Sequence, residues 1–430
     1  MKIGLEVHVA LPTKSKLFCS CSMADTDEPN SQICPICLGF PGAKPMLNEA
    51  AVSSALGIAA ALHCNINKEI SFVRKVYFYP DLPKCYQITQ MEGAIGSRGY
   101  LEIEGKEVRI RRVQIEEDPA QIVREGMLTL LDFNRSGTPL VEIVTEPDIT
   151  TEEELRAFIA NLRSILYYLG VDINKEIKAD LNISLAEVRV EVKNVTGIKS
   201  LIEATRFEIE RQAEAIKNGE EIARETRGYN EKNKLTESLR EKETDEEYGY
   251  IYDPDLTTFE INGIEHAKAV YITEVSQRLT EGTDVDPKTI KEMTMLDRRA
   301  LGLINKFNGK YKLRSVVHGM QRFQKYAGNL NAADHKIEKS IALAEKGVAI
   351  TKEMIQDIAE GKEVKVKYEK VGNAELDDMI KKFLDKNPKV LEEYRRNKKT
   401  ANLVIGIIAK ESNLHPKDVA RRVNQVLSAY

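Results

Sequence analysis

Four cysteines near the N-terminus form the densest group of metal-binding side chains in the sequence. One residue separates Cys19 from Cys21 and two separate Cys34 from Cys37, with twelve residues between the pairs. The second pair resembles a zinc knuckle, a tight turn that directs two thiolates at one metal. Four thiolates suit tetrahedral Zn²⁺ and leave no open position for a substrate, so we predict a structural zinc site. The alternative is a set of buried reduced thiols without metal, because the first spacing is unusual.

A second group consists of carboxylates and one histidine on predicted strands. Glu6 and His8 alternate with apolar residues over 3–9, so their side chains share one face of a strand. Glu142 lies in an apolar run, where an unpaired charge is costly. Further candidates at strand-like segments are Glu116, Glu117, Asp118 and Asp180. Such oxygen-rich groups suit Mg²⁺ or, with His8, Mn²⁺, but a carboxylate of this kind taken singly is more often a paired structural one.

The segment 74–87 mixes aromatic rings with Lys75 and Lys84. Aromatic and cationic side chains together can stack on a base or line a phosphate pocket, and an ordinary packed loop is the alternative. The sequence contains no Gly-x-x-x-x-Gly-Lys-Ser/Thr motif, so any nucleotide is held without a P-loop. No Gly-x-Ser-x-Gly elbow is present either, and no residue pattern indicates a covalent nucleophile.

Positioning these groups requires a large mixed α/β unit followed by helices. Apolar alternation predicts strands over 3–9, 101–103, 108–110, 140–145 and 188–192. Helical periodicity predicts helices over 49–62, 151–169 and 198–217, the second of which begins with a capping box of Thr151 and Glu154. Beyond about residue 275 the pattern is helical, with tail helices over 376–384, 390–396, 403–410 and 416–427 after a charged linker over 360–371.

Charge and hydropathy narrow the class of protein. The 430 residues include 63 basic and 67 acidic residues, so the net charge of −4 gives no global attraction for nucleic acid. Residues 361–430 carry 16 basic and 10 acidic residues, which fits either a polyanion contact or solvated helix faces. No apolar run approaches the roughly 18 residues of a membrane span, and the start lacks the pattern of a signal peptide. We therefore expect a cytoplasmic protein without a membrane partner.

The motifs occur together in the order found in one family. They occupy residues 4–9, 16–19, 34–42, 77–84, 116–118, 134–143 and 191–194. On these motifs the chain resembles the B subunits of aspartyl/glutamyl-tRNA amidotransferases, the GatB/GatE family. It departs from the family pattern at Val76, Cys85, Lys178 and Gly249. The segment 260–370 matches weakly, whereas the tail matches better, including Lys398.

The resemblance implies an α+β fold in three domains. A large β-rich, kinase-like cradle with a mixed or antiparallel sheet would occupy 1–280, a helical domain 281–365, and a small helical, YqeY-like, tRNA-binding tail 366–430. The implied activity is ATP- and Mg²⁺-dependent phosphorylation of the side-chain carboxylate of Asp-tRNA(Asn), Glu-tRNA(Gln) or both. Ammonia from an amidase A subunit, assembled with a small C subunit, would then displace phosphate.

The resemblance also implies roles for single residues. Glu6, His8, Glu117 and Glu142 would hold a divalent metal, and Glu116 with Asp180 would hold a second ion or the proton of the incoming ammonia. Lys75 and Lys84 would line a channel mouth or a phosphate pocket. Two other hypotheses remain open: a non-catalytic, zinc-containing tRNA-binding protein, and an ATP-dependent amidoligase acting on a small molecule.

Overall fold

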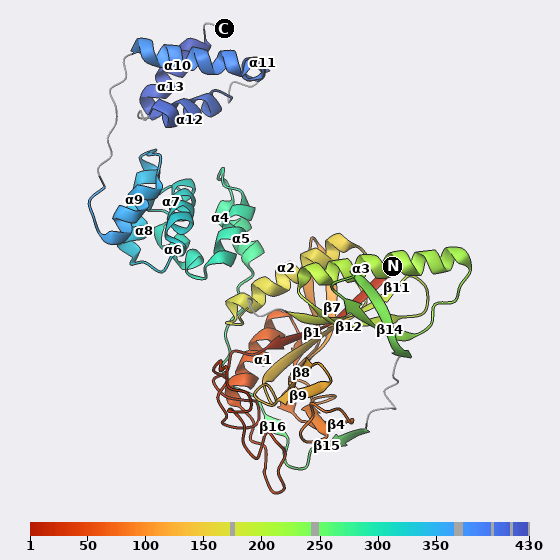
Figure 1. Ribbon diagram of the computed structural model, residues 1–430. Helices are drawn as coiled ribbons and strands as arrows, with labels where there is room; N and C mark the ends of the chain where they lie inside the picture. Colours follow the sequence, from red (N-terminus) through yellow and green to blue (C-terminus); the bar gives the residue numbers. More distant parts are fainter. Residues whose placement is uncertain (173–176, 242–248, 365–372, 397–399, 413–415, 429–430) are drawn as a thin grey trace. The chain divides into compact units, whose positions relative to one another are not determined.

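The computed structural model (Figure 1) describes all residues except 173–176, 242–248, 365–372, 397–399, 413–415 and 429–430. The chain divides into two compact units, Met1–Tyr271 and Ile272–Tyr430. The first unit contains the sheets and the second is helical. Among the described residues, no helix combines the length and apolar character needed to cross a bilayer.

A nine-stranded sheet organises the first unit, in the order β14-β13-β12-β11-β1-β10-β7-β6-β2. Its strands are β1 (Lys2–Ala10), β2 (Asn65–Ile66), β6 (Gly96–Ile103), β7 (Lys106–Glu117), β10 (Pro139–Thr145), β11 (Lys178–Ser184), β12 (Val190–Thr196), β13 (Glu225–Asn230) and β14 (Leu235–Glu241). Every ladder is antiparallel except β12 with β13. The expectation of a mixed α/β unit is therefore confirmed, and the strands predicted over 101–103 and 108–110 form the hairpin of β6 and β7.

The N-terminal strand lies at the centre of this sheet. β1 pairs with β10 on one side, where His8 is opposite Glu142, and with β11 on the other, where Glu6 is opposite Asp180. Ile3, Leu5, Val7 and Val9 are buried in the core, whereas Glu6 and His8 are half-buried on the other face. The alternation read from the sequence thus gives the sheet one apolar and one polar face.

Three helices pack on the apolar face, as Figure 1 shows: α1 (Glu49–Ala61), α2 (Glu152–Tyr168) and α3 (Ile198–Asn218). The Asn48 side chain accepts from the amides of Ala50 and Ala51 and starts α1. Thr151 Oγ1 accepts from the Glu154 amide at 3.1 Å, as the predicted capping box requires. The Glu154 carboxylate bonds instead to the Thr150 amide, one residue earlier than in the usual box.

Smaller sheets and loops surround the large sheet. A three-stranded sheet contains β4 (Val73–Val76), β5 (Tyr86–Thr89) and β15 (Gly249–Tyr252), and two-stranded sheets contain β3 (Glu69–Ile70) with β16 (Phe259–Glu260) and β8 (Gln121–Glu125) with β9 (Leu128–Asp132). The four predicted zinc ligands lie in the long connection between β1 and α1. Lys75 lies on β4, and Lys84 precedes β5.

The second unit holds two hydrophobic clusters. The first is formed within α4 (Ile272–Thr280), α5 (Pro287–Leu296), α6 (Arg299–Phe307), α7 (Leu313–Ala327), α8 (Asp334–Glu345) and α9 (Lys352–Glu360). The second is formed by α10 (Asn373–Lys386), α11 (Pro388–Arg396), α12 (Ala401–Ser412) and α13 (Pro416–Leu427), which confirms the four predicted tail helices. Residues 365–371 of the predicted linker, and Lys398, lie outside the described residues. α4 falls in the second unit, although the sequence analysis assigned it to the first domain.

Candidate functional site

Polar side chains from neighbouring strands converge on the face of the large sheet opposite α1 and α2. They comprise Gln114 and Glu116 of β7, Glu142 of β10, Glu6 and His8 of β1, Asp180 and Asn182 of β11, Glu191 of β12 and Thr226 of β13. These residues lie side by side because the strands that carry them are hydrogen-bonded neighbours in the sheet. We call this set the polar face.

His8 and Glu116 form the first interacting pair of the polar face. His8 Nδ1 lies 3.0 Å from Glu116 Oε1, and Thr89 Oγ1 donates to the other oxygen of Glu116 at 3.3 Å. Burial by itself lowers the pKa of His8, but the hydrogen bond to Glu116 and the surrounding carboxylates outweigh it and raise the pKa to about 10. Burial opposes ionisation of Glu116, yet His8 lowers its pKa overall. In this arrangement the pair is an imidazolium and a carboxylate.

Glu142 has a different electrostatic environment, although it lies directly opposite His8. Burial, together with the charge of Glu116, raises the pKa of Glu142 to about 7. The Gln114 amide nitrogen donates to Glu142 Oε2. Gln114 Oε1 and Arg112 Nε are buried and have no hydrogen-bond partner among the described residues. These unsatisfied atoms next to Glu142 can bind a ligand that offers both a donor and an acceptor.

Three carboxylates crowd together on the other side of β1. Ligand atoms of Glu6, Asp180 and Glu191 lie within 4.8 Å of one another. Asn182 donates to Glu6 at 3.0 Å and Thr226 donates to Glu191 at 3.1 Å. Three carboxylate oxygens at this spacing are the ligands that Mg²⁺ or Mn²⁺ prefers.

Glu191 was not among the predicted site residues. Its signal was present, because Glu191 lies between the buried residues Val190 and Val192 and therefore projects to the face opposite theirs. What the sequence did not contain was the register, which sets Glu191 opposite Asn182 on β11. The sequence thus indicates which face Glu191 occupies, but its proximity to Glu6 and Asp180 depends on strand pairing.

The structure places Glu117 away from the polar face. Consecutive residues of a strand project to opposite sides, so Glu117 cannot share the side of Glu116. Its carboxylate accepts from Lys84 Nζ at 2.5 and 2.6 Å and from the Ile88 amide at 2.9 Å. Lys84 and Glu117 line a cavity of about 180 Å³ that also reaches Cys37. The metal set expected from the family therefore divides: Glu6, His8 and Glu142 are together, and Glu117 is separate.

Lys75 and Lys84 occupy different surroundings. Lys84 is ion-paired to Glu117, whereas the charge of Lys75 acts on Glu116 and lowers the pKa of that carboxyl group, against the effect of burial. Lys75 Nζ also lies 5.8 Å from the centre of the Tyr77 ring. Lys75 is therefore, like Arg112, a cation that acts on carboxylates of the polar face.

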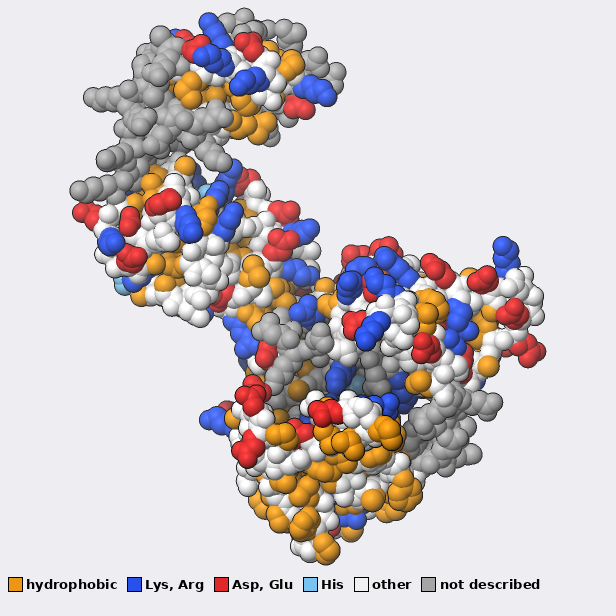
Figure 2. Space-filling view, viewed as in Figure 1, with side chains coloured by type: hydrophobic (Ala, Val, Ile, Leu, Met, Phe, Trp, Pro, Cys, Tyr) orange, Lys and Arg blue, Asp and Glu red, His pale blue; other side chains and the backbone are white. Residues whose placement is uncertain are grey.

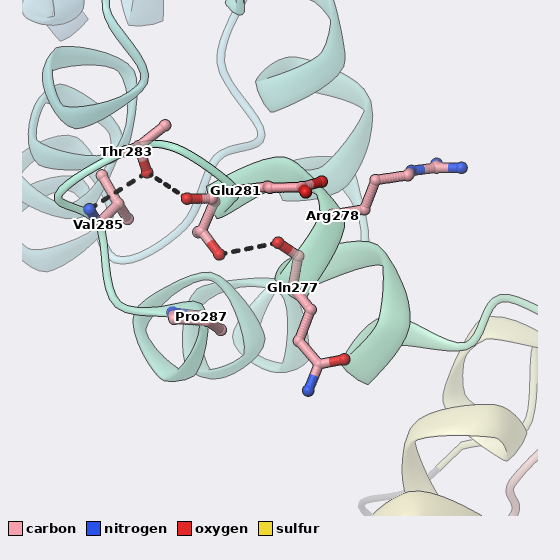
Figure 3. Close-up of a pocket in the computed structure, with 7 residues that line it drawn as sticks. Gln277, Arg278, Glu281, Thr283, Val285 and Pro287 are labelled. Atoms are coloured by element: carbon pink, nitrogen blue, oxygen red, sulfur yellow. Dashed lines mark hydrogen bonds between the residues drawn. The ribbon is translucent and has the colours of Figure 1, made fainter.

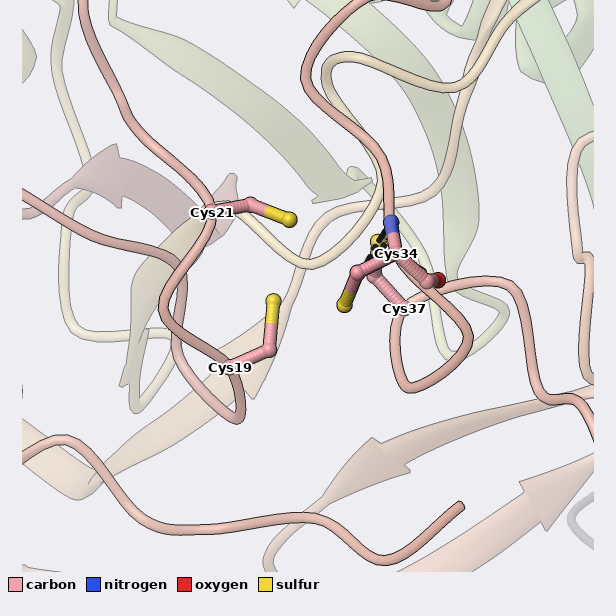
Figure 4. A group of neighbouring side chains, drawn as sticks. All are labelled: Cys19, Cys21, Cys34 and Cys37. Carbon is pink, nitrogen blue, oxygen red and sulfur yellow. Dashed lines mark hydrogen bonds between the residues drawn. The ribbon is translucent and has the colours of Figure 1, made fainter.

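The four predicted zinc ligands converge, as Figure 4 shows. The sulfurs of Cys19, Cys21, Cys34 and Cys37 all lie within 4.8 Å of one another, and Cys34 and Cys37 are 3.9 Å apart. A tetrahedral Zn²⁺ with bonds of about 2.3 Å separates its sulfurs by about 3.8 Å, so the group fits this ion. The hydrogen bond with Cys19 lowers the pKa of Cys37 to about 4, although burial acts in the opposite direction.

Lys16 supports the thiol cluster from one side. It is fully buried, and its ammonium lies 3.7 Å from Cys37 Sγ and 3.1 Å from the Phe133 carbonyl oxygen. Four thiolates around Zn²⁺ carry a net charge of −2, which a neighbouring ammonium partly offsets. The sequence analysis did not select Lys16, because nothing in the sequence indicates that it is buried.

A separate hollow at the end of α4 contains none of the predicted site residues (Figure 3). Thr283 Oγ1 donates to the Thr280 carbonyl oxygen at 2.8 Å and accepts from the Val285 amide at 3.3 Å. Thr280 Oγ1 in turn bonds to Gln277 O at 3.1 Å. These contacts provide partners for backbone groups at the end of α4, and we assign no function to the hollow.

Comparison with known proteins identifies the family. The family model described as "GatB/GatE catalytic domain" matches residues 1–265. The chain belongs to the GatB/GatE family. Similar proteins from Saccharolobus solfataricus, Thermotoga maritima and Clostridium kluyveri are 38%, 36% and 33% identical. The alignments cover 96%, 95% and 100% of this chain and 96%, 95% and 99% of those proteins.

Each of these relatives is named as the B subunit of an aspartyl/glutamyl-tRNA(Asn/Gln) amidotransferase. The match to the catalytic-domain model spans β1 to β16, so all residues of the polar face and the thiol cluster fall within the GatB/GatE segment. The relatives' name describes proteins that act in a complex with other chains. The helical unit lies beyond that model and is covered by the alignments with the relatives.

Proposed function

We propose that the chain is the kinase and transamidase subunit of a glutamine-dependent tRNA amidotransferase. Its substrates would be Asp-tRNA(Asn), Glu-tRNA(Gln) or both, whose side-chain carboxylate is phosphorylated by ATP and then amidated. The first unit would be the kinase-like cradle. The observation that carries the proposal is the convergence of Glu6, His8, Glu116, Glu142 and Asp180 on one sheet face in a member of this family.

Glu6, Asp180 and Glu191 are the residues that would hold the divalent cation. A bound Mg²⁺ or Mn²⁺ neutralises charge between the phosphoryl oxygens and the attacking carboxylate, which otherwise repel each other. His8 is protonated while it is paired with Glu116, so it becomes a metal ligand only after that proton leaves. This set differs from the family-based one: Asp180 and Glu191 join Glu6. Glu117 and Glu142 are assigned other roles.

Glu142 is the residue best suited to exchange a proton with the incoming ammonia. A pKa of about 7 allows its carboxylate to accept a proton from the attacking nitrogen near neutral pH. Glu116, which the family resemblance suggested for this role, has a lowered pKa and is a weaker base. Gln114 orients Glu142 through its amide nitrogen, and its free Oε1 can accept a hydrogen bond from the nitrogen.

Lys84 and Glu117 fit a passage for a small polar molecule better than a phosphate pocket. Both side chains are buried, and each neutralises the other's charge. The cavity beside them, about 180 Å³, is too small for a nucleotide but accommodates ammonia. We assign it to the path by which ammonia from the A subunit approaches β7.

The surface of the first unit is suited to protein partners. Figure 2 shows hydrophobic side chains gathered over one end of this unit. Large apolar residues with high exposure include Phe40, Met46, Phe78, Tyr79, Met127 and Leu128. Apolar residues exposed in such numbers are typical of an interface. We propose that the amidase A subunit and the small C subunit cover this end and that mischarged tRNA contacts the helical tail.

The test is transamidation of each mischarged tRNA by the chain assembled with its A and C partners. Glu142→Gln should reduce amide formation by at least about a hundredfold, the usual scale for losing a proton-transfer group, while tRNA affinity stays within about twofold. Glu107→Gln, at an exposed residue of β7 outside the polar face, is the matched control and should be fully active. Normal amidation by Glu142→Gln would refute the site. Specific tRNA binding without any amidation by the wild type would favour the zinc-containing binding protein.

A further inference from the structure

The last segment of the first unit runs along α1 without regular secondary structure. We call residues 264–271 the strap. Ser53 Oγ donates to the carbonyl oxygen of Glu265 at 2.6 Å. One helical turn later, a Cβ atom added at Gly57 would lie 3.2 Å from the carbonyl oxygen of Ala267, so only glycine permits this approach without a shift. The strap therefore follows one side of α1 in close contact.

The end of the strap is fixed by an aromatic stack. Tyr271 donates its hydroxyl to the carbonyl oxygen of Ala61, one more helical turn along α1, at 2.9 Å. Its ring stacks on His63 with centroids 5.6 Å apart, and His63 stacks on Tyr100 of β6 at 4.3 Å. His63 adopts a left-handed φ of 53°, which is uncommon for a residue other than glycine. A residue held in that conformation inside a stack indicates a position that the surroundings determine strongly.

The strap contacts are separate from the residues assigned to chemistry. Ser53, Gly57 and Ala61 are four residues apart, so they form a single line on α1. α1 packs on the apolar face of the sheet, and none of the contacts described above involves a residue of the polar face. Changes in the strap can therefore be separated from changes in the reaction itself.

The first helix of the second unit, α4, begins at Ile272, directly after Tyr271. We propose that the strap is a positioning element: it fixes the point on the first unit where the chain leaves that unit, and binding of aminoacyl-tRNA depends on this fixed exit point. This inference rests on the proposed function. Release of the strap lets that exit point move. Binding of aminoacyl-tRNA then requires additional ordering of the chain, which weakens the affinity.

The first experiment measures strap release without an activity assay. Lys268 is the only trypsin site within the strap. Tyr271→Ala removes both the stack and the hydroxyl contact, so we expect cleavage after Lys268 to accelerate about tenfold. Tyr271→Phe keeps the ring and should stay within about threefold of wild type. Tyr252→Ala, at an exposed tyrosine of β15, is the matched control and should not change the rate. Equal cleavage rates for Tyr271→Ala and wild type would refute the proposal that Tyr271 holds the strap on α1.

The second experiment connects the strap to substrate use in the assembled enzyme. Tyr271→Ala should raise the KM for mischarged tRNA about tenfold while kcat stays within about twofold. Gly57→Ala should also raise this KM, because its methyl group displaces Ala267, although alanine favours helix α1 by about 1 kcal/mol. Tyr271→Phe, which keeps the ring, should have a KM close to that of the wild type. An unchanged KM in a variant that trypsin cleaves rapidly would refute positioning alone. Absence of transamidation by the wild type would instead refute the proposed function, on which the inference rests.

Discussion

At the scale of single residues, the acidic group on β1, β11 and β12 defines the site most sharply. Glu6, Asp180 and Glu191 present three carboxylates within 4.8 Å of one another. Carboxylates at this distance repel unless a cation or a proton intervenes. The hydrogen bonds from Asn182 and Thr226 orient two of them but do not remove their charge. A cation bound among the three carboxylates would reduce this repulsion.

The variant Glu191→Gln tests both cation binding by the three carboxylates and the repulsion among them. We expect the affinity for Mn²⁺, measured by titration calorimetry, to fall at least about tenfold because one anionic ligand is removed. We expect the same variant without metal to unfold at a slightly higher temperature, since repulsion with Glu6 and Asp180 is reduced. Glu107→Gln, which removes a carboxylate at an exposed residue of β7 outside the acidic group, is the control and should leave Mn²⁺ affinity unchanged. Unchanged affinity in Glu191→Gln would exclude Glu191 as a ligand.

Part of the candidate site follows from the sequence, and part does not. Alternation along one strand places Glu6 and His8 on the same face, and cysteine spacing predicts the thiol cluster. The family-based set placed Glu117 with Glu6 and His8, whereas Glu117 and its neighbour Glu116 project to opposite sides of β7. Glu191 and Lys16 depend on register and burial, which arise from contacts between segments far apart in the sequence.

At the scale of elements, the connection from β10 to α2 is held by charge pairs to β7. Arg109 forms a bidentate pair with Asp148, at 2.7 and 2.8 Å, and Arg111 pairs with Glu146. The Arg109 amide also donates to Asp148 at 3.0 Å. The hydrogen bond from Arg109 lowers the pKa of Asp148, although partial burial acts against it. Helix periodicity predicted α1, α2 and α3 from the sequence. The ion pairs between β7 and this connection could not be predicted in the same way, because they join segments far apart in the sequence.

Asp148→Asn tests the stability that this pairing supplies. Because the folded pKa of Asp148 lies below its unfolded value, the charged form stabilises the fold above about pH 4, and this stabilisation is lost as pH falls through the folded pKa. Arg109 is largely exposed, so the difference in unfolding free energy at pH 7 is small. Urea unfolding of both proteins at pH 7 and pH 3 should show a difference that shrinks in acid. An equal difference at both values would contradict a charge-based origin.

At the scale of the whole molecule, charge is distributed unevenly along the sequence. The chain has a net charge of −4, yet residues 361–430 contain six more basic than acidic residues. The tail also has its own hydrophobic cluster, centred on residues such as Ile380, Val404 and Val423. Amphipathic periodicity predicted its helices well because their packing is local. The order of the nine strands was not predictable, because it depends on pairing between distant segments.

If the tail contacts tRNA phosphates, removing exposed cations should weaken binding in a salt-dependent way. Replacing Lys381, Lys386 and Lys389 by Gln should reduce tRNA affinity and lower the slope of log K against log salt concentration, by up to about 0.9 for each phosphate that a lysine no longer neutralises. Filter binding at several salt concentrations measures both quantities. A weaker affinity with an unchanged slope would indicate altered folding rather than the removal of phosphate neutralisation.

The control replaces three exposed lysines of the first unit. Lys199, Lys217 and Lys232 are the matched set, and their substitution by Gln changes the net charge equally. We expect a smaller effect on both affinity and slope, because a general charge effect acts only through long-range attraction. An equal effect of both triple variants would show that the tail does not bind tRNA specifically.

The central position of β1 in the sheet affects how the chain folds during synthesis. β1 ends at Ala10, but its neighbours β10 and β11 end at Thr145 and Ser184. About 170 further residues must therefore be synthesised before both edges of the first strand are paired, which takes roughly 10 to 35 s at typical elongation rates. During that interval Ile3, Leu5, Val7 and Val9 have no completed core. The nascent N-terminus is thus a natural client for a chaperone at the ribosome exit, whereas the hydrophobic cluster of the tail joins helices that follow one another in the sequence.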